Sequence, residues 1–160
     1  MYYKSWYDEL IREDSLKLEK VIPTKKQIEV LYTQLKKRSY SISHKALPSF
    51  NKHVIFVRNH PYRAWYIIKD NSIDLGNVYV HYDNSIGLSC NEKITADQIK
   101  QILMIIIRSL KPLAPKKSVR YGYYFMNIAV KNISLQKKLE KLGLIETQRT
   151  YVLDQETLKE

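Results

Sequence analysis

The sequence predicts a mixed α/β (α+β) fold, in which a mostly antiparallel central sheet carries helices on both faces. Three observations predict it. Short β-rich runs at 62–69, 75–82 and 86–90 are separated by two Asp-Asn-Ser turns, which is typical of an antiparallel meander. The apolar stretch 94–110 has the period of a helix. A strand followed at once by a capped helix fills 124–144, so strands and helices alternate along the chain.

Length and composition predict a single domain at 15–160, preceded by an amino-terminal extension at 1–14. The chain has 160 residues, of which 44% are hydrophobic, and it has 4 Gly and 5 Pro, so it is not of the disordered class. With 1 Cys and 4 His we expect neither a disulfide framework nor a metal site. No run reaches ~18 uncharged apolar residues and no signal layout opens the chain, so we expect a cytoplasmic protein without a membrane partner.

Local signals place the elements of the amino-terminal half. Residues 16–22 alternate apolar and charged side chains, as a half-exposed strand does. Thr24 and Gln27 form a capping box for the helix that follows. Residues 38–49 have neither period and form a loop, after which Ser49 caps a second helix.

The second half begins with the meander, in which Gly76 indicates a bulge or a close backbone approach. The helix at 94–110 starts with a second capping box, Thr95 with Gln98. In the stretch 124–144 the strand alternates its faces, Asn132 caps the helix, and Gly143 stands where a helix needs positive φ to stop.

This late stretch resembles the GNAT superfamily of N-acetyltransferases. The resemblance is carried by Asn127-Ile128-Ala129-Val130 in the strand, Asn132 and Ser134 at the helix start, and Glu140-Lys141-Leu142-Gly143-Leu144 at the helix exit. The segment 147–153 is similar to the last strand of that fold, and the element order agrees from 16 to 153.

The resemblance implies an enzyme that moves an acetyl or other acyl group from coenzyme A to an amine-bearing acceptor. It implies that two strands part near Cys90 and Asn127 to admit the thioester. Cofactor contacts are then expected from Leu88, Cys90, Thr95, Ala96, Gln98, Lys100, Asn132 and Ser134. The candidate catalytic residues are His44, in the loop that roofs the acceptor site in this family, His81 and Asn127.

The chain departs from the family at the helix start that follows the fourth strand. There the family carries Gln/Arg-x-x-Gly-x-Gly/Ala, whose bare N–H groups hold pyrophosphate. The run 95–100 has no glycine, and Asp97 places a carboxylate there. About 5 Å from a phosphate, this carboxylate opposes binding by about 3 kcal/mol at an effective dielectric of ~20, more than the roughly 0.3–2 kcal/mol a helix N-terminus contributes. In addition, Leu139 stands where many members have a proton-donating tyrosine.

The charge of the chain leaves further function classes open. Lys and Arg number 27 against 16 Asp and Glu, a net of +11, which favours anionic partners. The basic residues are also spread out, as on an ordinary solvated surface. One alternative is therefore a GNAT-fold protein with a degenerate cofactor site that binds or modifies nucleic acid through Lys116, Lys117 and Arg120. Another is a non-catalytic interaction module whose contact surface is the Tyr-rich segment 1–14.

Overall fold

The computed structural model describes residues 15–42 and 46–151. Their elements are β1 (Leu16–Lys20), α2 (Lys25–Lys36), α3 (Phe50–Arg58), β2 (Ala64–Asp70), β3 (Ile73–Val80), β4 (Ser85–Cys90), α4 (Ala96–Ser109), β5 (Phe125–Met126) and α5 (Ile133–Lys141). The strands form one sheet in the order β1-β2-β3-β4-β5. Neighbours from β1 to β4 pair antiparallel, and β5 pairs with β4 in parallel. The predicted mixed α+β fold with a mostly antiparallel sheet is confirmed.

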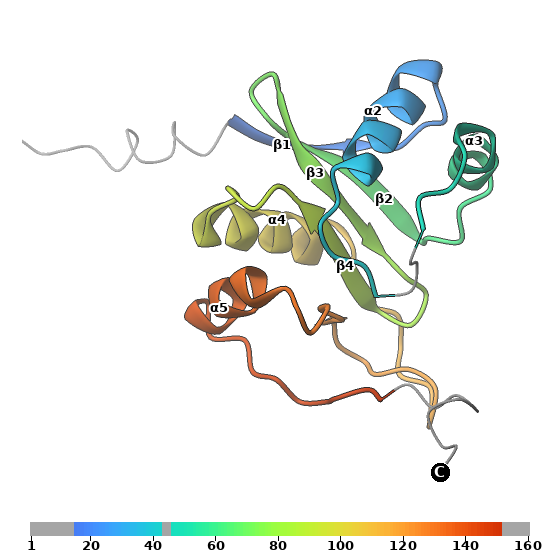
Figure 1. Ribbon diagram of the computed structural model, residues 1–160. Coiled ribbons are helices and arrows are strands. Elements are labelled where there is room, and N and C mark those ends of the chain that lie inside the picture. Colours follow the sequence, from blue (N-terminus) through green and yellow to red (C-terminus); the bar gives the residue numbers. More distant parts are fainter. Residues whose placement is uncertain (1–14, 43–45, 152–160) are drawn as a thin grey trace, which may run out of the picture.

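Helices cover both faces of the sheet (Figure 1). The alternation of β2 divides the core accordingly, because successive side chains of a strand point to opposite faces. Trp65 and Ile67 pack with α2 and α3, whereas Tyr66 and Ile68 pack on the side of α4 and α5. The fully buried isoleucines 99, 102 and 106 form the inner stripe of α4.

The helix ends follow the sequence signals, with one exception. At α4 both halves of the Thr95–Gln98 capping box are present. At α2 the Thr24 side chain accepts a hydrogen bond from Gln27 N–H, but the Gln27 side-chain oxygen Oε1 accepts from Ile22 N–H at 2.6 Å instead of closing the box. The Gln27 side-chain amide also donates to the Glu19 carboxylate, and it is therefore turned away from Thr24 N–H. Tertiary contacts thus override the local pattern.

Gly76 confirms the expected close backbone approach. A Cβ on this residue would lie 2.2 Å from the Ser89 carbonyl oxygen of β4, and its φ is +148°. The register of β2 against β3 shifts opposite it, between Ile68 and Lys69. Only a residue without a side chain fits between the two strands at this point.

Two expected strands differ from the structure. The strand predicted from residue 124 onward is paired at Phe125–Met126, and the chain from Asn127 leaves the sheet. The last strand expected at 147–153 is not formed over residues 147–151, and its final two residues lie outside the described part of the chain. The amino-terminal extension 1–14, with the contact surface proposed for it, also lies outside the described residues.

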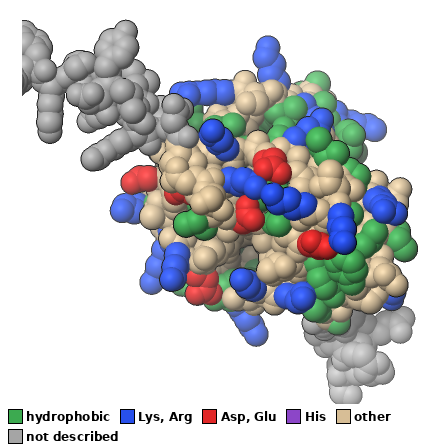
Figure 2. Space-filling view, turned by 90° about the horizontal axis from the view of Figure 1, so that it is seen from above, with side chains coloured by type: hydrophobic (Ala, Val, Ile, Leu, Met, Phe, Trp, Pro, Cys, Tyr) green, Lys and Arg blue, Asp and Glu red, His purple; other side chains and the backbone are tan. Residues whose placement is uncertain are grey.

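Charge is spread over the molecular surface. The face shown in Figure 2, seen from the side of α2 and α3, carries Lys and Arg side chains among acidic and apolar ones without a single dominant cluster. No helix in the described segments is long and apolar enough to span a bilayer. The same segments contain no group of three or more His, Cys, Asp or Glu side chains that could hold a metal ion.

Candidate functional site

β4 and β5 separate soon after they meet. Their parallel pairing joins Ser85 to Phe125 and Ile86 to Met126, and in the described chain it goes no further. β4 nevertheless continues to Cys90, still paired with β3. From Gly87 onward, one edge of β4 therefore faces a gap between the two strands.

The hydrogen bonds of β4 show which main-chain groups face this gap. His81 N–H donates to Ser85 O at 2.9 Å, and Asn91 N–H donates to Leu75 O at 2.9 Å. In an antiparallel pair the bonding direction alternates residue by residue, so residues 85, 87, 89 and 91 bond toward β3. The N–H and C=O groups of Leu88 and Cys90 consequently point away from β3, toward the side on which β5 has ended.

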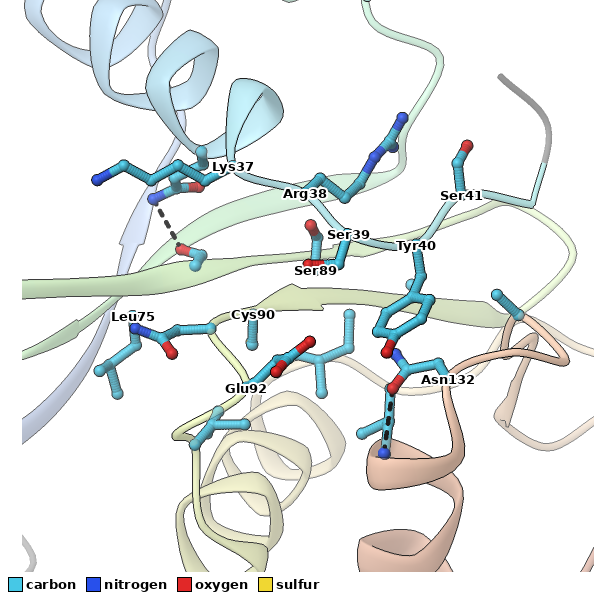
Figure 3. Close-up of a pocket in the computed structure, with 18 of the residues that line it drawn as sticks. Lys37, Arg38, Ser39, Tyr40, Ser41, Leu75, Ser89, Cys90, Glu92 and Asn132 are labelled. Atoms are coloured by element: carbon cyan, nitrogen blue, oxygen red, sulfur yellow. Dashed lines mark hydrogen bonds between the residues drawn. The ribbon is translucent and has the colours of Figure 1, made fainter. Parts of the chain in front are cut away.

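A cleft of about 810 Å³ occupies this gap. Its walls come from one face of α2 and the chain that follows it, from β3 and β4, from the loop after β4, and from residues between 127 and 138 (Figure 3). The cleft thus runs past the parted edge of the sheet and is bordered by elements of both helical layers.

Five of the residues predicted to form the site line this cleft: Leu88, Cys90, Asn127, Asn132 and Ser134. Asn132 also caps α5, because its side-chain oxygen accepts from Leu135 N–H at 3.2 Å. Burial raises the pKa of the Cys90 thiol to about 12, although the nearby Lys138 ammonium acts in the opposite direction. Cys90 is therefore an uncharged thiol at neutral pH and is not poised to act as a nucleophile.

The four residues predicted at the start of α4 do not line the cleft: Thr95, Ala96, Gln98 and Lys100. The polar groups of Thr95 and Gln98 are engaged within the protein. Thr95 N–H donates to the Gln98 side chain at 2.9 Å, and Gln98 N–H donates to the Thr95 hydroxyl at 3.1 Å. The Gln98 amide nitrogen in turn donates to the Asp70 carboxylate at 3.0 Å.

The loop between β4 and α4 uses its own donors in the same way. The Asn91 side chain accepts from Lys93 N–H at 2.9 Å, and the Asn91 carbonyl accepts from Ile94 N–H at 3.1 Å. Lys138 of α5 donates to the Glu92 carbonyl at 2.8 Å and so ties α5 to this loop. The loop is internally bonded instead of presenting a row of N–H groups to a ligand.

Of the two predicted histidines, the structure describes only His81. His44 lies outside the described residues. His81 packs edge-on against the rings of Tyr62 and Tyr79, with centroid distances of 5.0 and 5.3 Å, and it is not among the residues that line the cleft. Burial raises the pKa of both tyrosines, so they stay protonated at neutral pH. Tyr79 lines the cleft as part of this aromatic cluster.

Sequence reasoning missed other cleft residues, chiefly Tyr40, Ser89 and Glu92. Tyr40 follows α2 and extends across the cleft toward Asn132 (Figure 3). The loop around Tyr40 has no periodicity, and the signal that could have drawn attention to it is an aromatic residue in an otherwise polar loop. Glu92 is the second residue after β4 and lines the cleft together with Asn91.

The basic residues 116, 117 and 120 lie elsewhere, on the loop between α4 and β5. Lys116 and Arg120 form an isolated antiparallel bridge. The Arg120 guanidinium donates to the carbonyls of Ala114 and Tyr82, which fixes the loop against the β3–β4 turn. None of the three basic residues lines the 810 Å³ cleft.

Comparisons with known proteins show the fold. No family model matches the sequence, and no curated protein matches it. A solved structure of a domain from Methanocaldococcus jannaschii DSM 2661 is similar over 84% of this chain and 91% of that one, with a TM-score of 0.59 and 19% identity. The structure of a possible acetyltransferase from Clostridium difficile 630 is similar over 89% of this chain and 98% of that one, with a TM-score of 0.51 and 9% identity.

Proposed function

We propose that the protein is a GNAT-like N-acyltransferase that moves an acyl group from a thioester to an amine. The observation that supports this most is the parting of β4 and β5 after Ile86 and Met126. Because the strands part there, main-chain groups of Leu88 and Cys90 point into a cleft. Likeness to a possible acetyltransferase supports the fold that such a reaction uses, at 9% identity.

The proposed reaction needs few side chains. The amine nitrogen attacks the thioester carbonyl carbon, a C–N bond forms, and the carbonyl oxygen gains negative charge. The N–H of Leu88 faces this oxygen in the cleft and stabilises it, as donors aimed at a developing charge do. The C–S bond then breaks, the sulfur takes a proton, and the amine loses one.

Cleft residues are available for both protons. The Tyr40 hydroxyl is placed to protonate the departing sulfur, a role that Leu139, buried in the core, cannot fill. The Glu92 carboxylate attracts a protonated amine and takes its proton through water. His44 remains a candidate for the same step from the loop above, and Asn127 for positioning the acyl group.

Acetyl-CoA, the donor implied by the family, fits this site in part. The arm that carries the thioester fits the cleft beside Leu88, Cys90, Asn127, Asn132 and Ser134. The pyrophosphate finds little support at the start of α4, because the N–H groups of Thr95 and Gln98 are engaged with each other's side chains and Asp97 adds a carboxylate there. Only the thioester portion therefore enters the proposed chemistry.

The proposal is tested by acyl transfer from acyl thioesters to a panel of amines, with Leu88→Pro as the diagnostic variant. The N–H of Leu88 points away from β3. Proline at this position therefore removes the donor in the cleft and spares the hydrogen bonds between β4 and β3. Loss of one such donor lowers kcat by about 100-fold or more. The variant must retain wild-type circular dichroism, and Ser89→Pro, which breaks the ladder, is the control for unfolding.

Either of two outcomes contradicts the proposed function. The first is that no thioester binds or is turned over by the wild-type protein. The second is that a folded Leu88→Pro variant transfers acyl groups at the wild-type rate.

A second candidate function, nucleic-acid binding, is favoured by the loop that carries Lys116, Lys117 and Arg120. The neighbouring Tyr121 and Tyr123 are exposed, and their rings stack with centroids 5.0 Å apart. The sequence from 98 to 139 has nine Lys or Arg and no Asp or Glu. Exposed aromatic faces among cations are the combination that single-stranded nucleic acids recognise.

A further inference from the structure

The cleft suits the thioester-bearing half of coenzyme A, whereas the start of α4 does not suit the other half. The parted strands offer polar groups to an elongated arm, whereas the start of α4 offers little to a pyrophosphate. We propose that the protein takes its acyl group from a pantetheine or phosphopantetheine thioester and gains no affinity from the phosphoadenosine diphosphate half of coenzyme A. This inference rests on the proposed acyltransferase function and names its donor class.

Several hydrogen-bond donors at and before the start of α4 already have partners within the protein. An anion at a helix N-terminus is held by backbone N–H groups that the helix leaves unpaired. At α4 the capping box engages Thr95 N–H and Gln98 N–H. In the preceding loop the N–H groups of Asn91, Lys93 and Ile94 donate to carbonyl and side-chain oxygens at 2.9–3.1 Å. Two of the N–H groups at the start of α4 and those of the loop before it are thus engaged, and a pyrophosphate could use them only by displacing these bonds.

Negative charge at the start of α4 also opposes the binding of a diphosphate. Asp97 lies in the first turn of α4, and the Asp70 carboxylate is held against the same turn by the Gln98 amide at 3.0 Å. Both carboxylates repel a diphosphate. Lys93 and Lys100 bring opposite charge, but they are exposed, as Asp97 is, so solvent screens all three, whereas the half-buried Asp70 is held in place by Gln98. The turn is therefore arranged to stabilise the helix and not to bind an anion.

The cleft also offers hydrogen-bonding groups to the pantetheine arm. A pantetheine arm contains two amides, which need donors and acceptors along an extended path. Main-chain groups of Leu88 and Cys90 and the side chains of Asn127 and Asn132 supply both kinds in the cleft. Lys138 lines the cleft, where its ammonium donates to the Glu92 carbonyl at 2.8 Å, so one ammonium stands beside the arm for a single phosphate.

Calorimetry on the full chain tests this inference directly. The probes are coenzyme A, phosphopantetheine, pantetheine and the isolated phosphoadenosine diphosphate fragment. We expect coenzyme A and phosphopantetheine to bind with Kd values within about threefold of each other, less than the tenfold that corresponds to about 1.4 kcal/mol. We expect the fragment neither to bind nor to displace phosphopantetheine.

Transfer rates provide the second readout. The ratio of kcat/KM for acyl-coenzyme A over acyl-phosphopantetheine is expected to be near one. A preference for the coenzyme A form of more than about tenfold, in binding or in rate, overturns the inference and leaves the proposed function standing. Failure of every thioester to bind or react overturns the proposed function and the inference together.

A charge variant tests the reason given for the exclusion. Asp97→Ala removes a carboxylate from the start of α4, so we expect it to tighten coenzyme A binding by about threefold to tenfold and to leave pantetheine unchanged. Glu140→Ala removes an exposed carboxylate from α5 and is the matched control. Equal coenzyme A affinities in wild-type and Asp97→Ala proteins contradict the electrostatic exclusion on which the inference depends.

Discussion

At the residue scale, Asn84 joins three segments that are distant in sequence. It is fully buried and has a left-handed φ of 72° in the β3–β4 turn. Its amide nitrogen donates to the carbonyls of Leu113 and Tyr121 at 2.8 and 2.7 Å, and its amide oxygen accepts from Leu113 N–H at 2.8 Å. Its own carbonyl accepts from Phe125 N–H, so this one residue positions β5 beside β4 and with it the opening of the cleft.

We expect Asn84→Ala to lower the free energy of unfolding by about 3 kcal/mol or more, because two carbonyls and one N–H lose their partner in a buried place. Urea denaturation measures the loss. Asn71→Ala is the matched control, since Asn71 has a φ of 54° in the equivalent Asp-Asn-Ser turn but is exposed. Its loss should be about 1 kcal/mol, the cost of a left-handed residue other than Gly or Asn. Equal losses would contradict the bridging role of Asn84.

Cys90 allows a pH-dependent prediction at the same scale. Burial raises its pKa to about 12 in the folded protein, whereas an unfolded cysteine titrates near about 8.5. Because the thiolate is the reactive form, alkylation of the folded protein should be slow at pH 7 to 8, and its rate should rise about tenfold per pH unit up to and beyond pH 10. In urea the rate should level off above about pH 9. A folded protein whose alkylation rate levels off at that lower pH would show that Cys90 is not desolvated.

At the element scale, α5 ends in a complete Schellman motif. Leu144 N–H donates to Leu139 O at 3.1 Å, and Gly143 N–H donates to Glu140 O at 2.9 Å. Gly143 has a φ of +84°, and a Cβ there would meet nothing within 4 Å. The glycine is therefore required for its conformation and not for space.

Gly143→Ala is accordingly expected to cost about 1 to 2 kcal/mol, the penalty for a left-handed residue with a Cβ. Gly143→Asn should cost clearly less, because asparagine tolerates that conformation. Chemical denaturation of the two variants measures the difference. If alanine and asparagine cost the same, the conformational explanation is wrong.

Helix and strand ends could be predicted where the signal lies within a few residues of sequence. They were harder to predict where contacts with distant residues or strand pairing determine the end. Thr95 and Gln98 are close in sequence and form the box that their spacing predicts. Gln27 has the same spacing from Thr24, but its side chain is buried beside β1, and Ile22 and Glu19 take its hydrogen bonds. The strand beginning near residue 124 ends early for a related reason, since its length depends on pairing with β4, and the chain leaves β4 after Met126.

The same distinction applies to the candidate site. The lack of glycine in the run 95–100 could be read from the sequence, and so could the cleft positions of Leu88 and Asn132 from the family resemblance. Tyr40 could not be placed, because its position depends on how α2 sits on the sheet. Asn77 fixes that position, for its amide donates to the Gln34 side chain at 2.9 Å and its oxygen accepts from the Trp65 indole at 3.1 Å.

At the scale of the whole molecule, the net charge of +11 is unevenly distributed along the chain. The stretch 98–139 contributes nine basic and no acidic residues. On the loop before β5 this charge accompanies Tyr121 and Tyr123, which are 50% and 60% exposed. Their rings are stacked at an interplanar angle of 12°, and exposed aromatic rings of this kind are surfaces on which a base can stack.

We expect this loop to bind single-stranded nucleic acid with an affinity that falls steeply with salt. Neutralising three phosphates through Lys116, Lys117 and Arg120 gives a slope of log K against log salt of about −2. Tyr121→Ser with Tyr123→Ser should weaken binding by about 1 to 3 kcal/mol for each stacked base lost, without changing the slope. Lys116→Ser with Lys117→Ser should instead reduce the slope by about one or more.

Fluorescence anisotropy with a labelled oligonucleotide at several salt concentrations separates the two contributions. Tyr151→Ser, at an 83% exposed tyrosine outside the loop, and Lys25→Ser with Lys26→Ser, at the exposed start of α2, are the matched controls and should change neither affinity nor slope. If all four variants weaken binding alike, the attraction belongs to the general positive field of the chain, because a local platform requires that only the loop variants respond. Binding that does not depend on salt would exclude phosphate contacts by this loop altogether.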